Sequence, residues 1–147
     1  MAVIIAIVKY CPNLKSVYTI FGYYEVKTLE AILKSCQQLE SIETWCGHAL
    51  FGDYLNENKL LEMVVKYSPK TFYGLKMHFE CDTELFSEEL ESVFISWEDR
   101  KSQKPLSLNI ISINDLNVKK ESMEEIEKFK KLGVIKEFEI VKKKQLY

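Results

Sequence analysis

The chain has 147 residues, of which 47% are hydrophobic and 29% are charged, and this is enough to bury the core of one soluble domain. Its formal net charge of −2 gives no concentrated positive field, so we expect neither nucleic acid nor a membrane as a partner. The apolar residues 1–8 are too few to span a bilayer and carry no signal-peptide pattern.

The four cysteines show no paired framework, and two of them mark a repeat. The phrase Cys-x-x-Leu-x-x-(Val/Ile)-x-Thr begins at Cys11 and again at Cys36, 25 residues later (36 − 11 = 25). Neither the spacing of this pair nor that of Cys46 and Cys81 resembles a disulfide or zinc pattern. We therefore expect reduced cysteines in a cytoplasmic or nuclear protein, and a chain built from copies of one unit.

Each copy of the phrase follows an apolar helical stripe and continues as a strand. In the first copy the stripe covers residues 3–8 and stops before Pro12, and a strand is expected over 14–20. In the second copy Leu29, Ile32 and Leu33 form the stripe, and a strand is expected over 39–45. In each copy the helix comes first and the strand follows, and this order defines the repeat unit.

Three further units follow in the same order. The third has a helical stripe over 60–65 and a strand over 72–77, and the fourth has a longer helix over 85–97, with Ser87 as its cap, before a strand over 106–110. In the fifth, Ser122-x-x-Glu125 is a capping box, Gly133 is a left-handed C-cap, and the strand covers 135–140. The units span about 1–22, 23–55, 56–82, 83–117 and 118–142, with a tail over 143–147.

Equivalent strand positions are separated by 25, 33, 33 and 30 residues; they are Val17, Ile42, Leu75, Leu108 and Phe138. These spacings are near those of leucine-rich repeats stretched by loop insertions. Short helix–strand units favour a parallel sheet with all helices on one side, and single units must stack to bury their apolar faces. The sequence therefore predicts one α/β domain over 1–147, a ribonuclease-inhibitor-like leucine-rich-repeat solenoid of about five units with its strands on the concave side.

Alternation along the strands predicts which side chains leave the core. The outward positions fall into three rows across the sheet, and the first row is small over most of its length: Ser16, Ser41, Gly74, Ser107 and Glu137. The second row is polar, and the third is an apolar strip. We expect a protein partner to bind these two rows, through Tyr18, Ile20, Glu43, Trp45, Lys76, His78, Asn109 and Ile111.

Trp45 has two interpretations. It lies between Ile20 and His78 in the third row, where an exposed tryptophan is typical of the energetic centre of a binding site. The alternative is local packing, because the segment 46–55 is itself apolar and could cover the ring. In the binding interpretation, Trp45→Ala leaves the fold intact and abolishes capture of the partner.

No motif predicts catalysis, a metal or a cofactor. Cys46 with His48 and Cys81 with His78 lack the tight paired spacings of zinc ligands. Cys11 and Cys36 follow helix C-termini, where the helix dipole disfavours a thiolate. The five glycines form no phosphate-binding loop. We therefore expect a binding protein and not an enzyme, and an unrecognised α/β enzyme is the remote alternative.

The repeat phrase resembles a known family. Cys-Pro-x-Leu at Cys11, together with the segments 39–47, 65–70 and 88–97, is similar to the C-terminal leucine-rich-repeat region of a lineage-expanded set of fungal F-box proteins. The resemblance covers nearly the whole chain. It implies intracellular repeats that select protein substrates for a cullin–RING ubiquitin ligase, while an F-box ahead of them binds a Skp1-type adaptor.

No F-box segment is visible ahead of the repeats, so a Skp1-type adaptor is expected only if such a segment exists upstream. The apolar residues 3–8 and the open edge of the first strand are surfaces that a preceding segment, or another chain, is expected to cover. A stand-alone leucine-rich-repeat binding or scaffold protein, without a ubiquitin-ligase link, is the alternative function.

Overall fold

The computed structural model describes residues 6, 9–81, 83–85, 90–100, 103–113 and 116–142. Within them lie four named helices: α2 (Val26–Ser35), α3 (Glu57–Tyr67), α4 (Leu90–Asp99) and α5 (Lys120–Lys131). The strands are β1 (Ser16–Tyr18), β2 (Ser41–Cys46), β3 (Gly74–Phe79), β4 (Thr83–Leu85), β5 (Leu106–Ser112), β6 (Leu116–Val118) and β7 (Ile135–Lys142).

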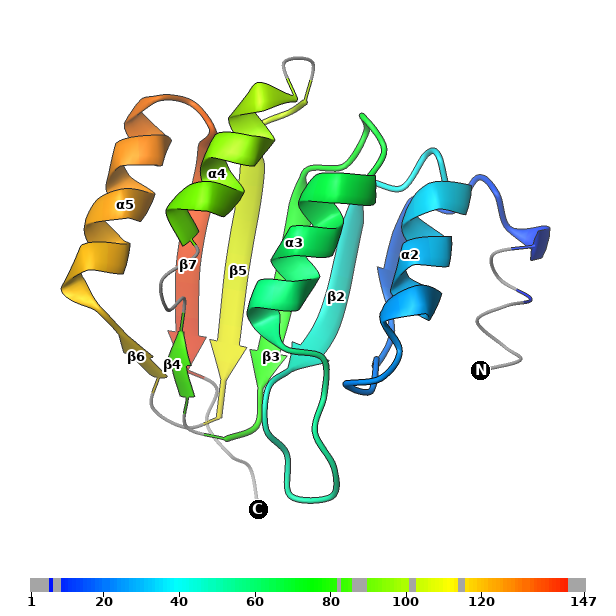
Figure 1. The fold of residues 1–147 in the computed structure, drawn as a ribbon, viewed down its shortest axis with the longest axis horizontal. Helices are drawn as coiled ribbons and strands as arrows, with labels where there is room; N and C mark the ends of the chain where they lie inside the picture. The colour runs from blue at the N-terminus through cyan, green and yellow to red at the C-terminus, as the bar shows by residue number, and fades with distance from the viewer. Residues whose placement is uncertain are drawn as a thin grey trace.

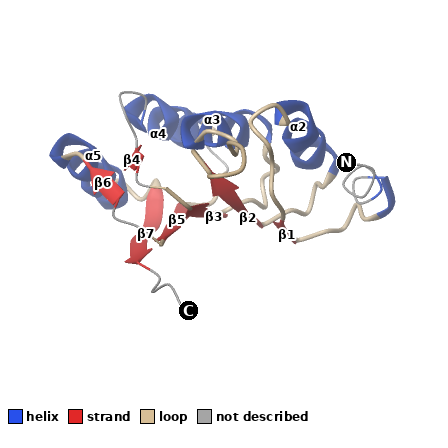
Figure 2. Ribbon diagram, turned by 90° about the horizontal axis from the view of Figure 1, so that it is seen from below, coloured by secondary structure: helices blue, strands red, loops and turns tan. Residues whose placement is uncertain are grey.

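Five strands form one all-parallel sheet in chain order, β1-β2-β3-β5-β7 (Figure 1). A second, two-stranded parallel sheet pairs β4 with β6. Helices α2 to α5 all lie over the same face of the large sheet (Figure 2). The predicted α/β class, with a parallel sheet and helices on one side of it, is confirmed.

The register of the sheet follows the repeat. Val17 pairs with Ile42, Ile42 with Leu75, Leu75 with Leu108, and Leu108 with Phe138. These are the five positions that the repeat phrase aligns, so the predicted alignment is confirmed. Because side chains alternate along a strand, one confirmed row fixes the faces of all the others.

The core lies between the sheet and the helices. Ile42, Leu75 and Leu108 point toward the helices and are at most 1% exposed, and α2 buries Leu29 and Leu33 against them. Burying each such side chain stabilises the fold by about 1.5–3 kcal/mol. The helical stripe and the strand alternation therefore meet in one hydrophobic core.

Arg100, just after α4, ties neighbouring units together at the ends of their helices. Its Nη1 donates to the hydroxyl of Ser68 at 2.6 Å and to the carbonyl of Val64 at 3.4 Å, and its Nη2 donates to the Ser68 carbonyl. The Val64 carbonyl also accepts from the Ser68 amide at 3.1 Å, so the guanidinium group adds to the hydrogen bonds at the C-terminal end of α3. The guanidinium group also lies 5.3 Å from the centre of the Trp97 ring.

Several predicted boundaries are wrong. Helix α5 begins at Lys120, so Ser122 lies buried in its first turn and does not cap it. Leu85 belongs to strand β4 and not to a helix, and β1 ends at Tyr18, before Ile20. Gly133 has φ of +78°, which confirms the predicted left-handed C-cap.

Other predicted features lie outside the described residues. These are the Ser87 cap, most of the stripe over 3–8 and the tail over 143–147. All four cysteines are free thiols.

Candidate functional site

The face of the sheet opposite the helices carries the three predicted rows. In the first row, Ser16, Ser41, Gly74, Ser107 and Glu137 pair in register across all five strands. Four of these five residues are serine or glycine, and the row lines a groove of about 430 Å³. Lys76 and Asn109 of the second row and Tyr73 also line this groove. The groove therefore lies where the first row carries mostly small side chains.

Beside the groove lies a group of rings that we name the aromatic cluster: Tyr18, Trp45, Tyr54 and His78. The ring of His78 stacks on Trp45 with centroids 4.9 Å apart, and on Tyr18 with centroids 5.7 Å apart and planes within 2° of parallel. The indole Nε1 of Trp45 donates to the Tyr18 hydroxyl at 3.0 Å. Three neighbouring strands therefore hold the rings in one arrangement.

Glu43 fixes the orientation of the histidine ring. His78 Nε2 lies 2.6 Å from Glu43 Oε2, and because a carboxylate only accepts, this bond places a proton on Nε2. His78 is only 8% exposed, since the two rings stack on it. It therefore supports the surface from below and offers a partner little direct contact.

The segment 46–55 approaches the cluster from the carboxyl end of β2. Tyr54 lies 6.0 Å from Trp45, ring centre to ring centre, and its hydroxyl donates to Glu80 at 3.1 Å. Burial and the bond to Glu80 raise the pKa of the Tyr54 hydroxyl. This contact covers one side of Trp45, which is half-buried, while Tyr18 is 60% exposed. The local-packing interpretation of Trp45 therefore holds in part, and the binding interpretation stays a prediction.

The structure brings some predicted site residues together and leaves others apart. Tyr18, Trp45 and His78 are in mutual contact, and Glu43 is bonded to His78. Lys76 and Asn109 lie along the groove, and Ile111 pairs in register with His78. Ile20 follows the end of β1, so it lies beyond the paired part of the third row.

Sequence reasoning missed Lys136, and it covered Tyr54 only through its segment. The local-packing interpretation expects the segment 46–55 to cover Trp45, and Tyr54 is a residue of that segment whose ring lies against Trp45. Lys136 lines the groove because the pairing between β5 and β7 shifts after Leu106, which leaves Lys136 as an extra residue on β7. Such a bulge re-aims side chains. A one-residue excess between Ile135 and Phe138, set against the spacing in β5, is the signal that could have revealed it.

Searches of protein-family models, curated proteins and solved structures found no match to the chain. In the described part of the chain, no group of three or more His, Cys, Asp or Glu side chains is placed to hold a metal ion. None of the helices that the structure describes has the length and apolar character needed to cross a membrane.

Proposed function

We propose that the chain is a leucine-rich-repeat solenoid that binds a protein partner on the sheet face opposite its helices. The order of the strands supports this proposal, because each of the four units from α2 onward adds one strand to the large sheet and one helix to the other side. Among the described elements, no helix covers the opposite face (Figure 2). A sheet face without a covering layer is available to a partner.

The aromatic cluster carries the proposal. Tryptophan and tyrosine are enriched among the residues that dominate binding energy, and they contribute most where they are held before the partner arrives. Here the Trp45–Tyr18 hydrogen bond and the Glu43–His78 pair hold the rings. The adjoining groove offers hydroxyl groups from Ser16, Ser41 and Ser107, together with the ammonium group of Lys76. Such a surface provides apolar anchors beside polar groups that can orient a partner.

In its fuller form, the proposal makes this chain the substrate-recognition part of an F-box-type ubiquitin ligase. The resemblance of the repeat phrases supports this form, and a Skp1-type adaptor would be bound only through an F-box joined to the chain. The alternative is a stand-alone binding or scaffold protein with the same binding face. The face itself supports both forms equally.

The experiment places a photo-reactive amino acid at one position of the full chain in cells. Position 109 lies on the proposed binding face, and position 96, exposed on α4, lies on the helix face as the matched control. We expect a defined protein adduct from position 109 that is absent from position 96. Adducts from position 96 alone would overturn the proposal.

The same adduct separates the two forms of the function. If the bound protein is a ubiquitin-ligase substrate, proteasome inhibition should raise the amount of the position 109 adduct several-fold. If the chain is a scaffold, the amount should not change.

A further inference from the structure

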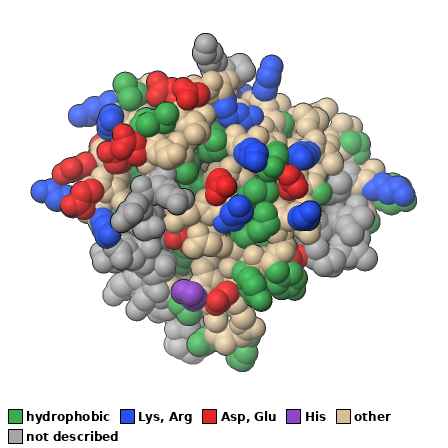
Figure 3. Space-filling view, in the orientation of Figure 1, with side chains coloured by type: hydrophobic (Ala, Val, Ile, Leu, Met, Phe, Trp, Pro, Cys, Tyr) green, Lys and Arg blue, Asp and Glu red, His purple; other side chains and the backbone are tan. Residues whose placement is uncertain are grey.

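The carboxyl ends of β1 and β2 carry a second surface, which meets the groove at Tyr18 and which we name the end patch. Leu50 is 79% exposed and Phe51 is 99% exposed, and the other four members are each more than half exposed. The end patch consists of Tyr18, Ile20, Tyr23, Tyr24, Leu50 and Phe51. Figure 3 shows hydrophobic side chains at the lower edge of the molecule, where Figure 1 places the loop that follows β2.

Backbone hydrogen bonds join the two segments that form the end patch. The amide of Leu55 donates to the carbonyl of Phe21 at 3.0 Å, and the amide of Tyr23 donates to the carbonyl of Asp53 at 3.3 Å. Gly22 and Tyr54 form an antiparallel bridge between these bonds. The patch is therefore one connected surface, although its members come from two repeat units.

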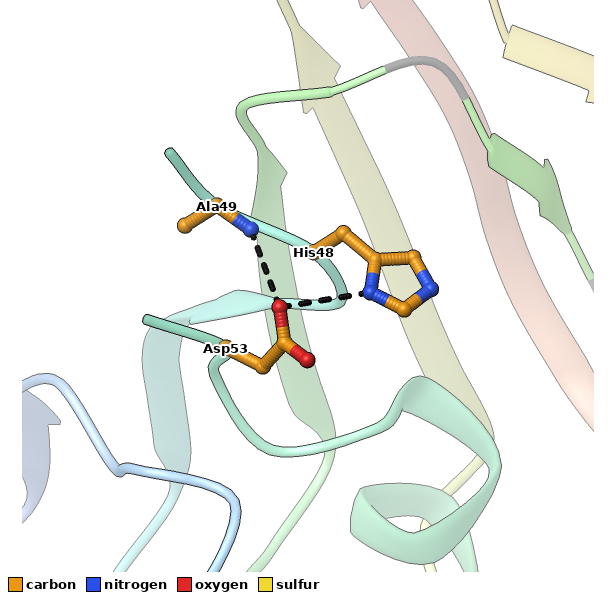
Figure 4. A network of polar contacts seen from close by, with 3 residues as sticks. All are labelled: His48, Ala49 and Asp53. Carbon is orange, nitrogen blue, oxygen red and sulfur yellow. Dashed lines mark hydrogen bonds and ion pairs between the residues drawn. The ribbon is translucent and has the colours of Figure 1, made fainter. Parts of the chain in front are cut away.

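The loop that carries Leu50 and Phe51 is closed by a side-chain clasp (Figure 4). His48 Nδ1 donates to Asp53 Oδ1 at 3.2 Å, and the amide of Ala49 lies 3.4 Å from the same oxygen. Gly47 and Gly52 have φ of +80° and +126°, values that L-residues rarely adopt. Because the loop is already shaped, ordering its tip on binding costs little entropy.

A hollow lies directly beside this protruding tip. Its volume is about 470 Å³, and its walls come from the bridge segment, the clasp and the first turn of α3, including Tyr23, Tyr54 and Lys59. A protrusion beside a hollow is self-complementary about a two-fold axis, because each copy can insert its tip into the other. The end patch therefore has the shape that an isologous dimer requires.

The charge of the end patch also suits a second copy. Segments 16–24 and 45–55 contain neither lysine nor arginine, and their one carboxylate, Asp53, is bonded to His48. Identical patches can meet without like-charge repulsion, and tyrosine hydroxyls both donate and accept hydrogen bonds across an axis. The end patch itself has no cationic side chain, and Lys59 in the wall of the hollow lies in the same wall as the carboxylates of Asp53 and Glu57, which disfavours an anionic lipid surface as the occupant.

The size of the end patch matches what a stable dimer needs. Aromatic side chains present roughly 150–250 Å² each, so these six exposed side chains offer about 800 Å² in total. That area is about one partner's share of a standard protein interface. A patch of this size, without net charge, is large for a protein surface that stays exposed to water.

We propose that the end patch is a homodimer interface in which two copies of this chain meet about a two-fold axis. Phe51 of each copy enters the hollow beside the tip of the other copy. This assignment shares Tyr18 with the proposed partner surface, but Leu50 and Phe51, which carry it, lie outside both the groove and the aromatic cluster.

Sedimentation of the purified chain across about a hundredfold range of concentration tests the proposal. We expect the wild type to shift from the mass of one chain to that of two, and Leu50→Ser with Phe51→Ser to weaken dimerisation at least tenfold. The Tm of this variant should match that of the wild type at concentrations where both are monomers, because dimerisation itself raises Tm. The matched control is Ile95→Ser with Leu132→Ser, which removes two exposed apolar side chains on the helix side. The control should dimerise as the wild type does.

Three results would overturn the dimer. They are a wild type that stays monomeric throughout, a tip variant that dimerises as well as the wild type, and binding of the monomer to lipid vesicles through the tip. A photo-reactive residue at position 51 adds a second readout that does not depend on a destabilising variant. It should attach to residues 22–24 or 53–59 of the other copy, and attachment to α4 or α5 would equally refute the interface.

Discussion

Glu43 and His78, which are 35 residues apart in the sequence, meet at 2.6 Å across two neighbouring strands. They lie in different rows of the sheet face opposite the helices, and the stacked rings of Tyr18 and Trp45 enclose the histidine. The pair therefore joins a polar row to the aromatic row. It sets the position of the surface that we propose to bind a partner.

Removal of Glu43 should destabilise the fold, because it takes away the carboxylate that accepts a hydrogen bond from the buried imidazole of His78. We expect Glu43→Ala to lower the free energy of unfolding by about 1–3 kcal/mol, measured by urea denaturation. Glu139→Ala is the matched control, since Glu139 is an exposed carboxylate in the same row and should change stability by about 0.5 kcal/mol or less. Equal losses in the two variants would show that the pair contributes nothing specific.

Trp45 should matter more for binding than for folding. Trp45→Ala removes the ring that stacks on His78 and the donor to Tyr18, but the residue lies on the sheet face away from the core. We expect a cooperative unfolding transition to persist in Trp45→Ala, while the photo-adduct from position 109 is lost. Trp45→Phe keeps a ring without the hydrogen bond and should retain part of the adduct. Complete unfolding of Trp45→Ala would assign the residue to packing.

Arg100 should stabilise the junction between α3 and α4. Arg100→Ala removes three hydrogen bonds to the end of α3, at Val64 and Ser68. A charge-assisted hydrogen bond contributes at most about 1.5–3 kcal/mol to stability. We therefore expect Arg100→Ala to lower the free energy of unfolding by about 2–4 kcal/mol, measured by urea denaturation. The control Lys128→Ala removes a half-exposed cation from α5 and should change stability by about 0.5 kcal/mol or less.

Glu57 should make stability depend on pH. Burial raises the pKa of its carboxyl group in the folded chain above the ordinary 4.5. At pH values between 4.5 and this raised pKa, the folded chain holds a proton that the unfolded chain has released. The free energy of unfolding therefore falls as pH rises through this interval. Glu57→Gln has no such proton, so its Tm should exceed that of the wild type at pH 7, and the difference should shrink below about pH 4.

The control for this pH effect is Glu62→Gln, which changes a more exposed glutamate on the same helix. Its difference from the wild type should stay within about 0.5 kcal/mol across the same pH range. A Glu57→Gln variant whose Tm difference from the wild type is the same at both pH values would contradict the assigned direction of the shift.

The sheet could be predicted from the sequence because the repeat of the helix–strand unit and the two-residue alternation along each strand agree. The repeat phrase aligns Val17 with Ile42, and the strand period of two then assigns every neighbouring side chain to a face. The rows that contain Ser41, Glu43 and Trp45 followed without any knowledge of the loops. Regular strand pairing allows this prediction because a register shift of one residue would turn the apolar side chains away from the core.

The remaining features depend on contacts that no period encodes. Tyr54 reaches Trp45 because the loop after β2 is bridged to Gly22, which belongs to the preceding unit. Lys136 reaches the groove through a bulge. The capping box predicts Ser122 as the N-cap of α5, three residues after the observed N-cap Lys119 (122 − 119 = 3), because Ser122 fits the pattern but packs into the core within the first turn.

The central claim is that the uncovered sheet face binds the partner. Side-chain oxidation of the chain, alone and with the protein identified from the position 109 adduct, tests it most directly. The account predicts that oxidation of Tyr18 and Trp45 slows several-fold in the complex, while that of Ile95 on α4, which is 44% exposed, does not change. Protection of Ile95 with unchanged oxidation of Tyr18 and Trp45 would place the partner on the helices and contradict the account.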